Sequence, residues 1–164
     1  MSVETILQAL EKLEHLHKSL LELAYKKTEM IKTGDTDSLD QLLKDEQAHV
    51  AAISQLEQQR QTVVTDYLRA KGIAPADHPT VAHVVDAADT MEEKEQLKAT
   101  RKKLLLVLET LKHQNDLNQK LTFQSLQFVH MTLDMLRPKP DQINYSNTEA
   151  RGPSKDQKYF DSQA

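Results

Sequence analysis

The chain has no cysteine and no tryptophan, and it contains little glycine, proline or aromatic residue of any kind. The lack of cysteine excludes disulfides, thiol nucleophiles and cysteine-based zinc sites. Because only three glycines and five prolines occur among 164 residues, long stretches are free to form uninterrupted helices. Aromatic residues make up only 4% of the chain, whereas a thick enzyme core usually needs more large rings. A thin bundle of long helices needs only aliphatic seams, and this composition favours such a bundle.

Charge and hydropathy argue against two further kinds of partner. The formal net charge of −4 provides no general attraction to nucleic acid. No apolar run approaches the ~20 residues that a membrane-spanning helix needs, so we expect no insertion into a membrane. The first residues, Met1 to Glu4, lack the basic segment and apolar core of a signal peptide, so we expect the protein in the cytoplasm.

The abundant residues are strong helix formers, chiefly Leu, Lys, Glu, Gln and Ala. Apolar residues recur at a spacing of three or four, which is the period of a helix with one buried face. Pro138 ends the last such pattern. We therefore expect an all-α fold with a single helical domain over residues 1–137 and a flexible tail over 138–164. The helices are predicted over about 2–33, 36–71, 80–89 and 91–137.

The first two helices are expected to form an antiparallel hairpin. Gly34 suits the left-handed position that follows a helix, and Asp35 suits the cap that begins the next one. A connection this short makes the two helices antiparallel neighbours. The long helix over 91–137 adds a third member, with the short 80–89 helix as a linker. The predicted architecture is an elongated three-helix bundle or coiled coil.

Apolar stripes identify the residues that we expect to be buried. The stripe of the first helix contains Val3, Ile6, Leu7, Leu10, Leu13, Leu20, Ala24 and Ile31. That of the second contains Leu39, Leu42, Leu43, Val50, Ile53, Leu56, Val63, Val64, Tyr67 and Leu68. The seam of the long helix contains Leu97, Leu104, Leu108 and Leu111, and then turns polar at Asn115, Asn118, Thr122 and Ser125. An asparagine in this seam either is buried and fixes the helix register, or is exposed and belongs to the surface.

The strongest indication of an enzyme is a pair of Glu-x-x-His motifs, Glu14 with His17 and Glu46 with His49. Residues three apart share a helix face, and carboxylate-bridged di-iron bundles use two such motifs. Those bundles also need a Glu from each of two further helices, whereas only three long helices are predicted here. The spacing also arises by chance in a Glu-rich chain with seven histidines. We therefore interpret these side chains as solvated, and we expect no catalytic residue, metal or cofactor.

The end of the long helix carries more apolar side chains than one buried face can hold. In one interpretation they form a surface for a partner helix, to which Met and Phe offer adaptable contacts. In the other, the first two helices, the 80–90 segment or a second copy of the chain in a homo-oligomer bury them. One stripe contains Leu117, Leu121, Phe128, Met131 and Met135, a second contains Leu126, Val129, Leu133 and Leu136, and Phe123 adds a further ring.

Short segments occur in a fixed order from the first hairpin to the end of the chain. Lys32-Thr33-Gly34-Asp35 precedes a Leu-Leu-Lys-x-Glu-Gln segment that runs from Leu42 to Gln47. The long helix contains Asn115-Asp116-Leu117-Asn118-Gln119-Lys120-Leu121, the tail contains Asn144-Tyr145-Ser146, and the chain closes on Phe160-Asp161-Ser162-Gln163-Ala164. In this combination the whole chain resembles the FlgN family of flagellar type III export chaperones. Family members often have Tyr-Gly where this chain has Tyr145-Ser146.

The resemblance implies a bacterial cytoplasmic chaperone for hook–filament junction proteins (FlgK- and FlgL-like). Such a chaperone binds the C-terminal helix of its substrate, prevents premature assembly and delivers the substrate to the cytoplasmic domain of the export gate (FlhA-like). On this chain the resemblance places substrate binding at 117–136. The tail, through Tyr145, Tyr159 and Phe160, is expected to dock to the gate or to cover the binding surface. A structural helical adaptor unrelated to secretion is the alternative, and it requires the 117–136 stripes to be buried within the free protein.

Overall fold

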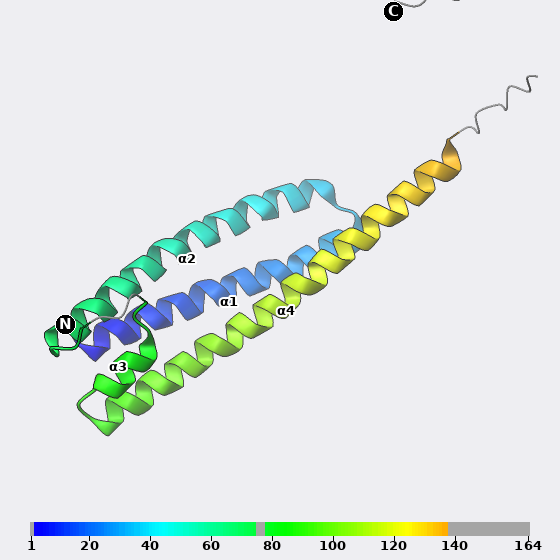
Figure 1. The fold of residues 1–164 in the computed structure, drawn as a ribbon. Helices are drawn as coiled ribbons and strands as arrows, with labels where there is room; N and C mark the ends of the chain where they lie inside the picture. Colours follow the sequence, from blue (N-terminus) through cyan, green and yellow to red (C-terminus); the bar gives the residue numbers. More distant parts are fainter. Residues whose placement is uncertain (1, 75–77, 138–164) are drawn as a thin grey trace, which may run out of the picture.

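The computed structural model describes residues 2–74 and 78–137, and these form helices joined by short connections. The helices are α1 (Val3–Thr33), α2 (Thr36–Ala70), α3 (Val81–Ala87) and α4 (Met91–Leu136), as Figure 1 shows. The predicted all-α fold is thereby confirmed, with its two long helices, short linker helix and longest final helix. The predicted tail over 138–164 lies outside the described residues.

The turn between α1 and α2 has the predicted chemistry. Gly34 ends α1 with a φ of 71°, a left-handed conformation that glycine adopts without a steric penalty. The Asp35 side chain accepts a hydrogen bond from the Ser38 backbone amide at 3.1 Å and so caps the start of α2. The chain reverses here, and α1 and α2 run antiparallel (Figure 1).

The arrangement of the long helices differs from a symmetric bundle. α1 packs against both α2 and α4, whereas α3 packs against α2 and α4 at one end of the molecule (Figure 1). α4 begins at the same end as α1 and runs parallel to it. Of the two hairpin helices, α4 packs mainly against α1. The reason is that α1 lies between the other two long helices and separates them.

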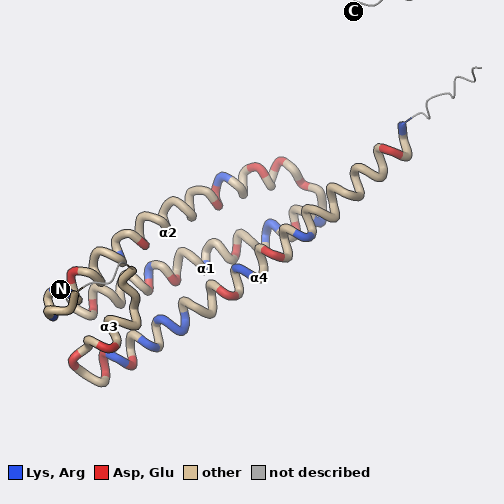
Figure 2. Tube along the Cα trace, in the orientation of Figure 1, with Lys and Arg blue, Asp and Glu red and all other residues tan. Residues whose placement is uncertain are grey.

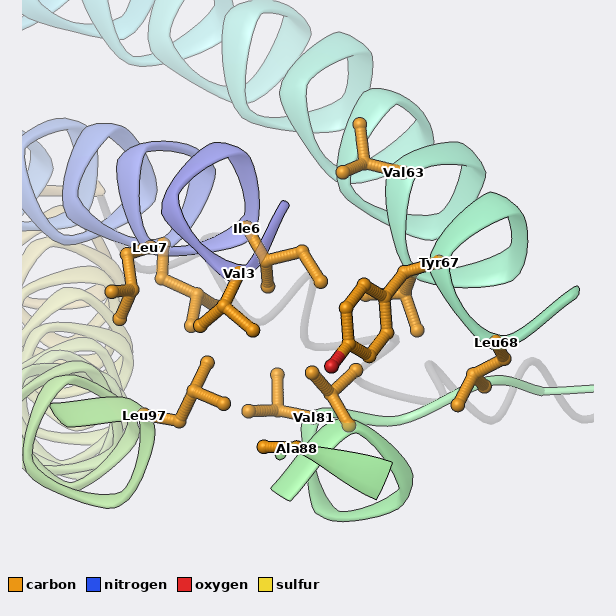
Figure 3. Packing of buried hydrophobic residues seen from close by; sticks show 12 residues of the cluster. Val3, Ile6, Leu7, Val63, Tyr67, Leu68, Val81, Ala88 and Leu97 are labelled. Atoms are coloured by element: carbon orange, nitrogen blue, oxygen red, sulfur yellow. The ribbon is translucent and has the colours of Figure 1, made fainter. Parts of the chain in front are cut away.

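The main hydrophobic core lies at the end where α3 is found. All four helices contribute to it, and their side chains converge there (Figure 3). Ile6, Leu68 and Leu97 are among its largest fully buried side chains. This cluster fixes the beginning of α4 against the beginning of α1. Its members are Val3, Ile6, Leu7, Leu10, Val63, Val64, Tyr67, Leu68, Val81, Val84, Ala88 and Leu97.

Away from this core the contacts between α1 and α2 become partly polar. The Lys27 ammonium is 2.9 Å from the Glu46 carboxylate, and Ser19 Oγ is 2.8 Å from His49 Nε2. Two predicted members of the α2 stripe, Leu43 and Val50, are exposed. The prediction was wrong at these positions because α2 has only α1 beside it along this stretch and cannot bury a wide stripe.

The seam of α4 along α1 was only partly predicted. Leu97, Val107 and Leu111 are buried in it, whereas Leu108 is only half-buried. In the polar continuation, Asn118 is buried and Asn115 is exposed. The alternative left open for the asparagines is thus decided in favour of burial at Asn118.

Candidate functional site

The apolar end of α4 is exposed. We call its ten predicted site residues the α4 apolar surface. Leu121 is half-buried, and each of the other nine side chains is at least 40% exposed. Neither α1, α2 nor α3 covers them, so the interpretation in which these helices bury both stripes is wrong. The surface comprises Leu117, Leu121, Phe123, Leu126, Phe128, Val129, Met131, Leu133, Met135 and Leu136.

The exposure follows from the lengths of the helices. α1 ends at Thr33, where the chain turns back into α2, whereas α4 continues past this turn (Figure 1). Beyond Asn118 no residue of α4 is buried. Apolar side chains that would have filled a seam against α1 are therefore left largely exposed in the described chain. Monomeric proteins rarely expose apolar side chains in such continuity, and this makes the surface a candidate binding site.

Both apolar stripes flank a line of small hydroxyl side chains that prolongs the α1-facing seam of α4. Positions seven residues apart share one helix face, so Ser125 and Thr132 continue the line of Leu111 and Asn118. Ser125 Oγ donates to the Leu121 carbonyl at 2.9 Å, and Thr132 Oγ1 donates to the Phe128 carbonyl at 2.9 Å. Because both hydroxyls are satisfied within α4, this face can accept an apolar partner without leaving a hydroxyl donor unpaired.

The same stretch of α4 carries no charge. Residues 121–133 contain no Asp, Glu, Lys or Arg, and Figure 2 shows this part of the helix as one uninterrupted tan segment. Lys120 and Asp134 lie at its two ends. The cores of protein interfaces are similarly depleted of charged residues, whereas the exposed faces of helices normally are not.

A hollow of about 380 Å³ lies where the hairpin turn meets α4. Leu126 and Val129, from the second apolar stripe, form one wall of it, and Met30, Ile31 and Leu39 form the opposite apolar wall. The α4 apolar surface therefore extends onto the tip of the hairpin. Its lining comprises Met30, Ile31, Gly34, Asp35, Thr36, Leu39, Thr122, Ser125, Leu126 and Val129.

One ionisable group lies at the rim of this hollow. Hydrogen bonds from Ser38 lower the pKa of the Asp35 carboxyl below its ordinary value. Asp35 therefore remains a carboxylate at neutral pH, committed to capping α2. It gives the hairpin tip a negative charge beside an otherwise apolar hollow.

Sequence reasoning missed the contribution of the hairpin tip. Ile31 and Leu39 had been assigned to the apolar stripes of the first two helices, but not to the candidate site. Their positions on either side of Gly34 were a usable signal, because residues that flank a tight turn are brought together at its end. That α4 passes this tip at Leu126 could not be read from periodicity.

The residues proposed for a di-iron site have other partners. Glu14 forms an ion pair with Lys18 at 2.7 Å, and Glu46 forms one with Lys27 at 2.9 Å. His17 Nδ1 is 2.7 Å from the Leu13 carbonyl, whereas His49 contacts Ser19 and the Asp45 carbonyl. Over residues 2–74 and 78–137, no three metal-ligating side chains gather into a group that could hold an ion.

Two further expectations concern the tail and membranes. The tail residues Tyr145, Tyr159 and Phe160 lie outside the described residues, so their proposed role stays a prediction. Among the described helices, none combines the length and the apolar character needed to cross a bilayer.

Comparison with known proteins gave one family and one relative. Residues 1–151 match the family described as FlgN protein. The chain is 36% identical over 166 aligned residues to the uncharacterized protein YvyG of Bacillus subtilis (strain 168), and the alignment covers 100% of both chains. No solved structure matches the chain.

Proposed function

The chain belongs to the FlgN family of flagellar export chaperones, and from this premise we propose that α4 captures the C-terminal helix of a hook–filament junction protein. The observation that carries this proposal is the exposed, uncharged α4 apolar surface. The family is one of chaperones rather than enzymes and binds hook-associated proteins. That the partner is a junction protein, and that the chain delivers it to the export gate, are parts of the proposal.

The partner that fits this surface is an amphipathic helix. Its apolar residues would recur at a spacing of three or four and lie between the two stripes of α4. Past the end of α1, such a helix would lie beside Ser125 and Thr132, on the face of α4 that α1 contacts nearer the start of α4. The side chains of Phe128 and Met131 would then flank it, and methionine adapts its shape to partners that differ in detail.

The hollow at the hairpin tip supports the same arrangement. A helix that continues the line of α1 meets the tip where Ile31, Leu39 and Leu126 surround the hollow. We propose that an apolar side chain near the end of the substrate helix enters it. Burial of the helix in this way removes from water the apolar face that the junction protein needs for assembly, which would keep the subunit unassembled in the cytoplasm.

The competing adaptor hypothesis requires the stripes to be buried within the free chain. Phe128 is 65% exposed and Met131 is 51% exposed, so the described chain does not meet that requirement. This exposure favours a chaperone that awaits a substrate over an adaptor with a closed core.

We further propose that the tail, through Tyr145, Tyr159 and Phe160, docks to the cytoplasmic domain of the export gate. We expect a chain truncated after Pro140 to retain the junction protein in a pull-down as well as the full chain does, because α4 is intact. Export of that junction protein into the medium is expected to fall about tenfold or more, because a large share of the docking free energy would be lost with the tail aromatics.

The same pair of measurements has two contrary outcomes. Failure of the full chain to retain any junction protein would contradict the proposed substrate. Tighter retention by the truncated chain, with undiminished export, would instead show that the tail covers the α4 apolar surface. The matched control exchanges Tyr145, Tyr159 and Phe160 for alanine in a tail of full length, which separates the rings from the length of the tail.

A further inference from the structure

A buried polar layer joins α1 to α4 near the end of their contact. Thr28 of α1 and Gln114 and Asn118 of α4 are each at least nine-tenths buried. They are the only polar side chains that are buried among the described residues, and they come from segments about 90 positions apart in the sequence. Buried polar side chains are unusual in an aliphatic seam and call for a specific role.

Every member of this layer has a hydrogen-bond partner in it. Gln114 Nε2 donates to Thr28 Oγ1 at 2.6 Å, and Thr28 Oγ1 lies 2.6 Å from Asn118 Oδ1, to which it donates. Asn118 Nδ2 donates to the Ala24 carbonyl at 2.8 Å. No buried side-chain nitrogen or oxygen of the described residues is left without a partner. The layer is therefore satisfied in this helix register, and a shift of either helix would break it.

The apolar part of the seam defines the register less sharply. Leu97, Leu104 and Leu111 follow one another at intervals of seven, so a displacement of α4 by one heptad places leucine on leucine. A displacement toward the start of α1 would also draw Leu121 and Phe128 alongside α1 and bury them. Burial of Leu121 and Phe128 thus favours the slipped register. The core around Leu97 opposes the slip.

The polar layer penalises that slip. After a shift of seven residues, Gln114 and Asn118 would lie beside apolar positions of α1, and Thr28 would face Ser125 in place of Asn118. Buried amides without partners cost more than their hydrogen bonds contribute. A single polar layer is known to fix register in coiled coils by this mechanism.

We infer that Thr28, Gln114 and Asn118 are positioning residues that hold α4 in the register in which its apolar end extends past the hairpin. The layer is the last buried one in α4, at the boundary between the part that packs on α1 and the part that is exposed. The inference that this extension serves substrate binding rests on the proposed function. The inference about register does not.

The register can be measured directly, because the chain has no natural cysteine. Cysteines introduced at Glu11 of α1 and Lys120 of α4, both exposed, carry a pair of spin labels outside the layer. In the native background we expect one distance by pulsed dipolar spectroscopy. In the variant Thr28→Val, Gln114→Leu, Asn118→Leu we expect a second population that is shorter by up to about 10 Å, the rise of seven helical residues.

Two variants of Thr28 serve as matched controls. Thr28→Val is isosteric but leaves Gln114 and Asn118 without the hydroxyl, so we expect the second population at a lower proportion. Thr28→Ser keeps the hydroxyl, and a single native distance is expected. Circular dichroism checks that each variant is helical. A single, unchanged distance in both the triple variant and Thr28→Val would overturn the inference.

Substrate affinity provides the functional readout. Measured affinity for the junction-protein helix should fall in proportion to the fraction of molecules in the native register, twofold when half have slipped. A slip that leaves affinity unchanged would contradict the proposed binding surface and not the register inference. An unchanged register would contradict the inference whatever the affinity, so the two failures are distinguishable.

Discussion

Replacing Phe128 and Met131 together by glutamate is expected to weaken binding of the junction-protein helix by about a hundredfold. Both side chains belong to the first apolar stripe, and each is more than half exposed in the free chain. In the complex they would be buried, and a glutamate in their place would have to lose its hydration against an apolar helix. Isothermal titration with the isolated C-terminal helix of the junction protein measures the change.

The fold should not be affected by this double substitution. Substitutions at exposed positions usually change the free energy of unfolding by no more than about 0.5 kcal/mol. Neither Phe128 nor Met131 contributes to the core. A matched control is Lys120→Gln with Gln127→Glu, which changes the net charge by the same amount on another face of α4. Gln127 lies seven residues from both Lys120 and Asp134, on the face that already carries charge. Equal affinity losses in both double variants would show that charge alone, and not this stripe, governs binding.

Replacing Leu97 by alanine is expected to lower the free energy of unfolding by about 3 kcal/mol. Leu97 is completely buried and is the α4 member of the core that all four helices share (Figure 3). Truncation removes its transfer free energy and leaves a cavity that the surrounding α1 and α3 side chains can close only in part. Urea denaturation followed by circular dichroism measures the effect.

The matched control is Leu106→Ala on the same helix. Leu106 is 65% exposed, so its truncation should change the free energy of unfolding by no more than about 0.5 kcal/mol. Similar losses for the two variants would mean that the core around Leu97 does not anchor α4. In that case the polar layer at Thr28 would be the main determinant of register.

The hairpin and the helix boundaries could be predicted because their signals are local. Gly34 and Asp35 have chemistry that suits the end of one helix and the start of the next, whatever surrounds them. The buried stripe of α1 was likewise predicted well, since α1 lies between two neighbours and uses a broad face. Burial on α2 was overestimated at Val50 because periodicity does not reveal how many neighbours a helix has.

The candidate site was predictable in its sequence but not in its surroundings. The apolar surplus of 117–136 is visible in the sequence, and its exposure follows once α1 is known to end before α4 does. The hollow between Leu39 and Leu126 depends on two segments that meet only in space. Gln114 was missed because an amide on the buried seam is not distinguishable from a surface amide until its partner Thr28 is known.

The central claim is that a substrate helix docks on the end of α4 and reaches the hairpin tip. Amide hydrogen exchange of the chain, with and without the C-terminal helix of a junction protein, tests it most directly. Beyond Asn118, α4 has no buried residue and meets only the hairpin tip among the described residues, so its amides should exchange quickly in the free chain, and binding should slow them. We predict slower exchange over residues 119–136 and over the tip at 30–39, with α2 from Val50 to Ala70 unchanged. Slower exchange confined to α1 and α2, with the amides of 119–136 unaffected by the added helix, would contradict the account.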